Sequence, residues 1–240
     1  MTNTAYITNT DSNSLSVVDI DSAHEFGRIE IGDTPRGAMA IDTDKNLGFV
    51  SNCAGDTISI IDLLKNSETK LVHVGLAPRG VEISPNLDYV FVSNSGSATV
   101  SFVSTTKLET VFELEVGRNP RQLSISSDGS FIAVPNFGSD SVSIIDINYD
   151  DITKSSVRTE ISLPRDAKPY HAFIDNFDPL IFTANTFNHS VSVIDIEKES
   201  VTNNIPVGYG PRAVISDTTG KYLFTSEEAS NAVRKNFYNV

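Results

Sequence analysis

Short runs of β-branched and aromatic residues alternate along the whole chain with turn-forming residues. In the stretch from residue 38 to 74, four such runs fall at 38–41, 48–51, 57–61 and 70–74, separated by Asp-Lys-Asn, Ala-Gly-Asp and Leu-Lys-Asn-Ser. Runs of this length and composition, bounded by Gly, Asn and Asp, are typical of β-strands joined by tight turns. No stretch shows apolar residues at helical spacing. The pattern therefore predicts an all-β protein.

Three sequence blocks recur along the chain at a nearly constant spacing. The first ends in an asparagine, and successive copies stand 43, 42, 42 and 49 residues apart, at Asn9, Asn52, Asn94, Asn136 and Asn185. One further step of 42 residues leads to Glu227. The second block is a strand of the type Ile58-Ser-Ile-Ile-Asp62, and it begins six residues after each asparagine. The third is Pro-Arg, at prolines 35, 78, 120 and 211, with Pro169-Tyr170 in the fourth place. Fixed spacing of this kind indicates a repeat architecture.

Four short strands in each period of about 42 residues are what a β-propeller blade requires. In the third strand of a period neither face carries a charge, since Ile58 and Ile60 alternate with Ser59 and Ile61. A strand covered on both faces within an antiparallel unit fits a sheet stacked between two others. We predict a single β-propeller domain over residues 1–240, with four-stranded antiparallel blades. The repeats lie near 5–46, 47–88, 89–130, 131–179 and 180–221, followed by a partial repeat at 222–240.

Four motifs point to a particular kind of repeat: Tyr6-Ile-Thr-Asn9, Ser192-Val-Ile-Asp195, Ile205-Pro-Val-Gly208 and Ser127-Asp-Gly129. Their combination resembles the YVTN family of β-propeller repeats, over nearly the whole chain. That family includes surface-layer and periplasmic propellers and is similar to seven-bladed lactonases. The resemblance implies the propeller fold. A propeller is a scaffold that hosts many functions, so the activity has to be argued from the site.

The number of strands bears on how the propeller closes. With the Pro-Arg strand innermost, the chain begins at the second strand of one blade and ends near the third strand of another, which makes 22 strands. Six full blades would need about 24. We predict about six blade positions with imperfect closure; a five-bladed ring with an overhanging hairpin and a piece of a longer propeller are the alternatives. Because open strand edges attract other strands, we expect them to promote self-association.

Composition and charge exclude several classes of function. The chain has 31 Asp and Glu against 18 Lys and Arg, a net charge of −13, which argues against binding nucleic acid. No apolar run approaches the roughly 20 residues of a membrane-spanning helix. The single cysteine, Cys53, excludes internal disulfides and a cysteine-based zinc site. No signal peptide is visible, so we expect a cytoplasmic protein if the chain is complete, and an extracellular or periplasmic one if it belongs to a longer exported protein.

The Pro-Arg block falls in the loop before each innermost strand, so its arginines should stand around one mouth of the central channel. Guanidinium groups suit carboxylate and phosphate, and the predicted series is Arg36, Arg79, Arg121 and Arg212. Since the motif repeats, the alternative is that each arginine only bonds to the neighbouring blade and holds the ring together. Residues that break the repeat are better candidates for a specific site, and these are Tyr170, His171 and Glu82.

The other repeated polar residues are interpreted as structural. The asparagine that ends each second strand is expected to cap backbone N–H groups of its turn. The aspartate that ends the third strand is expected to accept hydrogen bonds in a turn or from a neighbouring blade, at Asp19, Asp62, Asp146 and Asp195. No motif for a metal, a nucleotide cofactor or a catalytic triad is present, so we predict no metal, no cofactor and no catalytic residue.

The leading hypothesis is a non-catalytic β-propeller that acts as a binding or structural scaffold. It would recognise a protein partner or a small anionic ligand on the channel-mouth face. The alternative is a lactonase-like hydrolase of a small anionic lactone, with Glu82, His171 and one arginine supplying the general base and the group that polarises the carbonyl. A third hypothesis is a segment of an exported surface protein.

Overall fold

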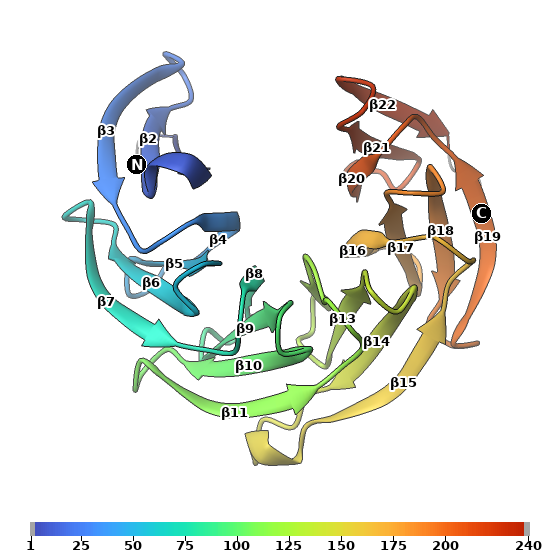
Figure 1. The fold of residues 1–240 in the computed structure, drawn as a ribbon, viewed down its shortest axis with the longest axis horizontal. Coiled ribbons are helices and arrows are strands. Elements are labelled where there is room, and N and C mark those ends of the chain that lie inside the picture. Colours follow the sequence, from blue (N-terminus) through green and yellow to red (C-terminus); the bar gives the residue numbers. More distant parts are fainter. Residues whose placement is uncertain (1–2, 238–240) are drawn as a thin grey trace. The chain divides into compact units, whose positions relative to one another are not determined.

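A computed structural model of the chain describes residues 3–237, and within them it contains 22 β-strands and two short 3-10 helices. The strands form six antiparallel sheets, each a blade of a β-propeller, so the predicted all-β propeller is confirmed (Figure 1). The chain divides into two compact units, one up to Glu113 and one from Leu114 onward. Each unit holds three blades that stand side by side.

The first unit contains blades 1 to 3. Blade 1 has three strands in the spatial order β1-β2-β3, and blades 2 and 3 have four each, in the orders β4-β5-β6-β7 and β8-β9-β10-β11. A 3-10 helix, η1 (Thr10–Ser12), links β1 to β2. The strands are β1 (Thr4–Asn9), β2 (Ser14–Asp19), β3 (His24–Glu30), β4 (Pro35–Asp42), β5 (Leu47–Asn52), β6 (Thr57–Asp62), β7 (Ser67–His73), β8 (Pro78–Ile83), β9 (Tyr89–Asn94), β10 (Thr99–Ser104) and β11 (Glu109–Glu115).

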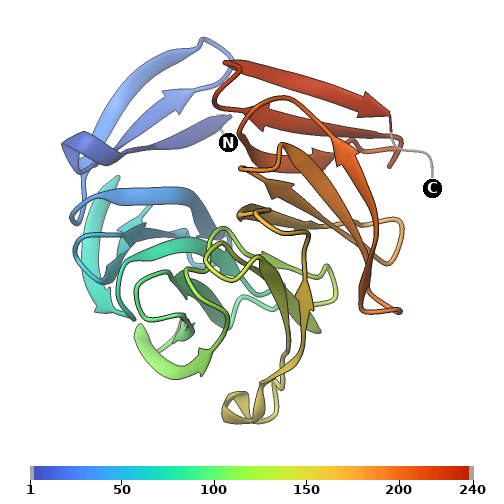
Figure 2. The same ribbon diagram turned by 45° about the vertical axis from the view of Figure 1, so that its right-hand side comes forward.

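The second unit contains blades 4 to 6, which follow one another from green to red in Figure 2. Blades 4 and 5 have four strands and blade 6 has three, β20-β21-β22. A second 3-10 helix, η2 (Ile152–Lys154), occupies the extra residues of the fourth repeat. The strands are β12 (Ser124–Ile125), β13 (Phe131–Asn136), β14 (Ser141–Asp146), β15 (Ser156–Ser162), β16 (Pro169–Ile174), β17 (Leu180–Asn185), β18 (Ser190–Asp195), β19 (Ser200–Pro206), β20 (Pro211–Ser216), β21 (Tyr222–Glu227) and β22 (Ala232–Phe237).

The strand count and the three-stranded first and last blades agree with the count made from the repeats. The mode of ring closure depends on how the two units are placed, and it stays a prediction. In the segments that the structure describes, no helix has the length and apolar character needed to cross a membrane.

The core of each unit lies between successive blades. In the first unit, Leu15 and Val17 of blade 1 pack against Val50 and Ile61 of blade 2. The opposite face of blade 2, which includes Ile60, packs against blade 3. Blades 4, 5 and 6 are joined by equivalent apolar clusters in the second unit. Each blade therefore contributes one face to the blade before it and one to the blade after it, which explains why the third strand is uncharged on both faces.

The repeated asparagine acts differently from its predicted role as a cap of backbone N–H groups. In blade 4 the amide nitrogen of Asn136 donates to the hydroxyls of Ser141, at 3.0 Å, and Ser143, at 2.8 Å. The same pair of bonds, to the hydroxyls five and seven residues later, recurs at Asn9, Asn52, Asn94 and Asn185. The asparagine therefore ties the second strand to the third across their turn, and the capping prediction was wrong.

The aspartates that end the third strands mostly form the predicted turns. Asp62 accepts hydrogen bonds from the backbone N–H groups of Leu64 and Lys65, each at 3.0 Å. Equivalent backbone bonds exist at Asp19 and Asp195. Asp146 instead binds the guanidinium of Arg158, because η2 and its flanking residues replace the short turn there.

Candidate functional site

Two arginines of the Pro-Arg blocks, Arg79 and Arg212, form side-chain hydrogen bonds within their own blades. The proline before each arginine pairs with the residue that ends the second strand, as Pro78 does with Asn94. The arginine is thereby placed beside the turn that follows the asparagine. Arg79 Nε donates to Ser95 Oγ at 3.2 Å, and Arg212 Nε donates to Glu228 Oε2 at 2.7 Å. Neither of these two hydrogen bonds joins one blade to another.

The guanidinium of Arg121 lies over the aromatic ring of the equivalent turn residue. The guanidinium carbon of Arg121 lies 4.7 Å from the ring centroid of Phe137, which directly follows Asn136. Arg36, the fourth member of the series, is paired with Ser51 in blade 2, and its buried Nε has no hydrogen-bond partner among residues 3–237. The residue that follows the repeated asparagine, or follows Glu227 in blade 6, thus determines what the arginine of that blade contacts. The contact is a hydroxyl, a carboxylate or an aromatic ring.

In the second unit these contacts join into a continuous row across three blades. The guanidinium carbons of Arg212 and Arg121 lie 4.3 Å and 5.3 Å from the ring centroid of Tyr170. The Phe137 ring makes edge-to-face contacts with Tyr170, at 6.5 Å, and with Phe187, at 6.0 Å. We call these five side chains the guanidinium–aromatic row. Its members come from turns and strand starts of blades 4, 5 and 6.

The row is accessible to solvent and carries positive charge. Phe187 is 61% exposed, and the Arg212 side chain is 37% exposed. Arg118 adds a third guanidinium beside Phe137, since its Nη2 donates to the backbone oxygen of Gly138 at 3.0 Å. Glu228 offsets the charge of Arg212. A locally cationic surface on a protein of net charge −13 favours the approach of an anion to this place.

His171 follows Tyr170 in sequence and serves the packing of the blades. Its Nδ1 accepts the backbone N–H of Val214 at 3.3 Å, which links β16 to β20. Burial lowers the pKa of His171 to about 4, so the imidazole is neutral at pH 7. Because Nδ1 already accepts a hydrogen bond, the other ring nitrogen carries the proton. His171 therefore has no lone pair available as a general base in this state.

Glu82 lies on β8 in the first unit, directly opposite Phe91. Burial raises the pKa of its carboxyl group from 4.5 to about 7. Within the described part of the chain its carboxylate forms no hydrogen bond or ion pair. Glu82 is thus a half-buried acid that titrates near neutral pH.

The structure brings together Arg121, Tyr170 and Arg212 from the predicted site, with His171 directed toward Val214. Arg36, Arg79 and Glu82 belong to the first unit, and their gathering with the others at one channel mouth stays a prediction. The sequence reasoning missed four residues of the site, Arg118, Phe137, Phe187 and Glu228. Phe137 and Phe187 fall one or two positions after a repeated asparagine, where an alignment of the repeats shows no aromatic residue in the other blades.

Comparison with known proteins finds a partial match to one family of β-propellers. A family model for "Lactonase, 7-bladed beta-propeller" matches residues 78–168, which is less than half of the chain. No curated protein sequence matches the chain. The matched segment contains Arg79, Glu82, Arg121 and Phe137.

Several solved structures share the fold. A putative 6-phosphogluconolactonase from Bacteroides uniformis is 17% identical, with a TM-score of 0.82 over 98% of this chain and 77% of that one. A protein of unknown function from Desulfotomaculum acetoxidans is 14% identical, with a TM-score of 0.83 over 99% and 79%. Hydrazine synthase from Kuenenia stuttgartiensis is 19% identical, with a TM-score of 0.65 over 98% and 92%. At these identities the likeness concerns the fold alone.

Proposed function

We propose that the protein is a non-catalytic binding propeller, and that the guanidinium–aromatic row recognises a small anion with an apolar or aromatic body. The observation that carries this proposal is the placement of two guanidiniums, Arg121 and Arg212, against the single ring of Tyr170. The exposed ring of Phe187 extends the same row and offers an apolar contact.

The chemistry of stacked guanidiniums supports this ligand class. A guanidinium held over an aromatic face is stabilised by a cation–π interaction, and its N–H groups point outward in the plane, where a carboxylate or phosphate can accept two of them. The neighbouring His171 is neutral and its Nδ1 is already bonded to Val214, which favours binding over acid–base catalysis at this place.

Calorimetric titration with benzoate and phenyl phosphate tests the proposal. We expect saturable binding of at least one probe, weakened about tenfold by Arg121→Ala and by Arg212→Ala, since a hydrogen bond to a charged group contributes about 1.5–3 kcal/mol. Arg158→Ala is the matched control, because Arg158 lies over the Phe131 ring at 5.5 Å on outer strand β15. Absence of binding at millimolar probe, or an equal loss in the control, contradicts the proposal.

The second candidate is a lactonase-like hydrolase. It is favoured by the family match over residues 78–168 and by the acid Glu82 within that segment, whose pKa of about 7 suits proton transfer at neutral pH. Hydrolysis of glucono-δ-lactone and of its 6-phosphate tests it. Turnover above the spontaneous rate that Glu82→Gln abolishes would replace the binding proposal with this one.

We also propose that the repeats are of the YVTN type, on the strength of motifs such as Tyr6-Ile-Thr-Asn9. Under this assignment the chain belongs either to a cytoplasmic protein or to a longer exported surface protein. The genomic sequence on both sides of the coding region tests the second case, since it predicts further repeats and an export signal.

A further inference from the structure

The residue that follows the second strand changes from blade to blade, and in blade 6 it is an acid. In blade 3 this position is held by Ser95, whose hydroxyl accepts a hydrogen bond from Arg79 Nε at 3.2 Å. In blade 6 it is held by Glu228, whose Oε2 accepts Arg212 Nε at 2.7 Å and also contacts Arg212 Nη2. The carboxylate therefore occupies one donor edge of the Arg212 guanidinium, where blade 3 offers a neutral hydroxyl.

This ion pair is part of the second unit and touches the guanidinium–aromatic row directly. The guanidinium carbon of Arg212 lies 4.3 Å from the ring centroid of Tyr170 in blade 5. The backbone N–H of Glu228 donates to the backbone oxygen of Gly210 at 3.0 Å, which fixes the turn beside the start of β20. The Glu228 side chain is 62% exposed. Glu228 is thus an accessible negative charge in contact with a cationic member of the row.

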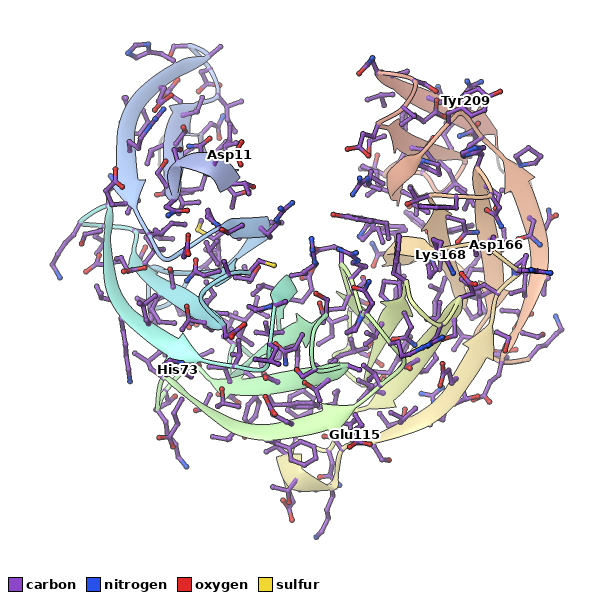
Figure 3. All side chains as sticks on the ribbon, viewed as in Figure 1. Asp11, His73, Glu115, Asp166, Lys168 and Tyr209 are labelled. Carbon is purple, nitrogen blue, oxygen red and sulfur yellow. The ribbon has the colours of Figure 1, made fainter. Side chains whose placement is uncertain are left out.

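The apolar part of the row is held next to the ion pair. Thr186 Oγ1, in the turn that carries Phe187, donates to the backbone oxygen of Pro211 at 2.9 Å, and this proline directly precedes the arginine of the pair. Tyr209, which Figure 3 shows in the second unit, packs edge-to-face against His189 of the same turn, with ring centroids 4.9 Å apart. A ligand whose apolar body contacts Phe187 therefore has the ion pair of blade 6 near its anionic group.

We propose that Glu228 determines which ligand charge the row accepts, so that the ligand class is a monoanionic carboxylate and not a dianion such as a phosphate monoester. This inference rests on the binding function proposed above. Glu228 occupies a donor edge that an anion would otherwise use, and it repels the anion in proportion to the charge of the ligand. Because an exposed ion pair is weak, the carboxylate lowers affinity without blocking the site.

Calorimetric titration of the full chain with benzoate and phenyl phosphate at about pH 8, where the phosphate is a dianion, tests the proposal. We expect the wild type to bind benzoate at least as tightly as phenyl phosphate. Glu228→Gln should tighten benzoate about threefold and phenyl phosphate about tenfold, since repulsion energy doubles with the ligand charge and the second factor is roughly the square of the first. The order of the two probes then reverses.

Two further variants separate the position of the charge from its removal. Glu228→Ser reproduces the pair of Arg79 and Ser95 in blade 3 and should give the same reversal. Glu197→Gln is the matched control, because Glu197 is exposed and lies in the turn between β18 and β19, at the end of β18 opposite the turn of Phe187. It removes one negative charge and should leave both affinities unchanged.

The outcomes distinguish this inference from the binding function on which it rests. If benzoate binds and Arg212→Ala weakens it, but Glu228→Gln changes both probes by one factor, the binding function stands and the inference is wrong. Weaker binding of both probes by Glu228→Gln also overturns it, since Glu228 would then position Arg212. Tighter binding of phenyl phosphate than of benzoate by the wild type overturns it as well.

The remaining outcomes concern detection of binding. If neither probe binds to the wild type or to the Glu228 variants, the binding function fails and the inference fails with it. Binding detected only in the Glu228 variants, and tighter for phenyl phosphate than for benzoate, supports both.

Discussion

Blades 4 and 6 use opposite hydrogen-bonding chemistry at the end of their second strand. We call this place, where the second strand turns into the third, the corner of the blade. In blade 4, Asn136 donates to Ser141 and Ser143. In blade 6 its place is taken by Glu227, which accepts the backbone N–H of Gly208 at 2.7 Å and Arg234 Nε at 2.9 Å. The residues five and seven positions later, serines in blade 4, are Ala232 and Arg234 in blade 6.

The comparison shows that the corner selects a matched set of side chains rather than asparagine itself. An amide donates to two hydroxyls, whereas a carboxylate only accepts, so the exchange of Asn for Glu requires a donor in place of a serine. Arg234 supplies it. Burial by itself raises the pKa of Glu227, but the hydrogen bonds from Gly208 and Arg234 outweigh burial, and the net pKa is lowered. The carboxylate is therefore ionised at pH 7.

Both corners also depend on a glycine. A Cβ atom on Gly117 would lie 2.4 Å from Asn136 Nδ2, and one on Gly208 would lie 1.8 Å from Glu227 Oε2. The polar side chain of each corner thus fills the space that a side chain at the glycine would need. This explains why a glycine stands three residues before the proline of both Pro-Arg blocks.

The largest expected effect comes from removing the carboxylate of blade 6. Glu227→Ala leaves the Gly208 N–H and Arg234 without their acceptor in a corner where the glutamate side chain is fully buried. We expect the free energy of unfolding to fall by about 3 kcal/mol. This is the lower end of the range for breaking a buried ion pair, because Arg234 is half-exposed. Urea unfolding followed by circular dichroism at pH 7 measures it. Glu228→Ala, which breaks an exposed pair with Arg212, is the control and should cost less than about 1 kcal/mol. Equal losses would show that burial of the corner does not matter.

The neutral corner should be less costly to break. Asn136→Ala removes two side-chain hydrogen bonds, each contributing about 1 kcal/mol, and leaves no buried charge behind. We expect the free energy of unfolding to fall by about 2 kcal/mol in the same urea experiment. A loss as large as that of Glu227→Ala would contradict the distinction drawn between the two blades.

Much of the fold could be predicted from the sequence, because each blade repeats one local pattern. The spacing of Asn9, Asn52 and Asn94 located the second strands, and the count of 22 strands followed from the repeats. The bonding of the corner could not be predicted, since the repeat spacing places Glu227 at the asparagine position without showing its partners. Its partner Arg234 is recognisable only after the asparagine is known to bond to the residue seven positions later.

The candidate site was predicted in part for a related reason. Arg121, Tyr170 and Arg212 belong to the repeated block or replace one of its residues, so their positions could be deduced from spacing. Phe137 and Phe187 meet them through the stacking of one blade on the next, and spacing along the chain does not show which turns touch. The role of His171 depends on a backbone N–H of the following blade, which the sequence does not reveal.

An exchange of chemistry should recover part of the lost stability. Glu227→Asn alone introduces an amide with no hydroxyl acceptors and leaves Arg234 unpaired. Adding Ala232→Ser and Arg234→Ser rebuilds the set found in blade 4. We expect the triple variant to regain about 1 kcal/mol relative to Glu227→Asn, which is a typical coupling energy for groups in direct contact. Arg234→Ser alone is the control and should destabilise the protein. Additive losses in the triple variant would mean that the set is not transferable between blades.

The smallest effect expected is a difference in pH dependence between the two corners. The folded pKa of Glu227 is below its ordinary value of 4.5, so its contribution is present above pH 4.5 and is lost as the pH falls through the folded pKa. The stability of the wild-type chain relative to Glu227→Gln should therefore shrink as the pH falls from 7 to 3.5. The cost of Asn136→Ala should stay constant over that range, because neither the amide nor its serine partners titrate. Urea unfolding of the wild type against each variant, at pH 7 and at pH 3.5, measures both trends. If the free-energy cost of both substitutions falls equally with pH, acid weakens the whole unit and not the carboxylate corner in particular.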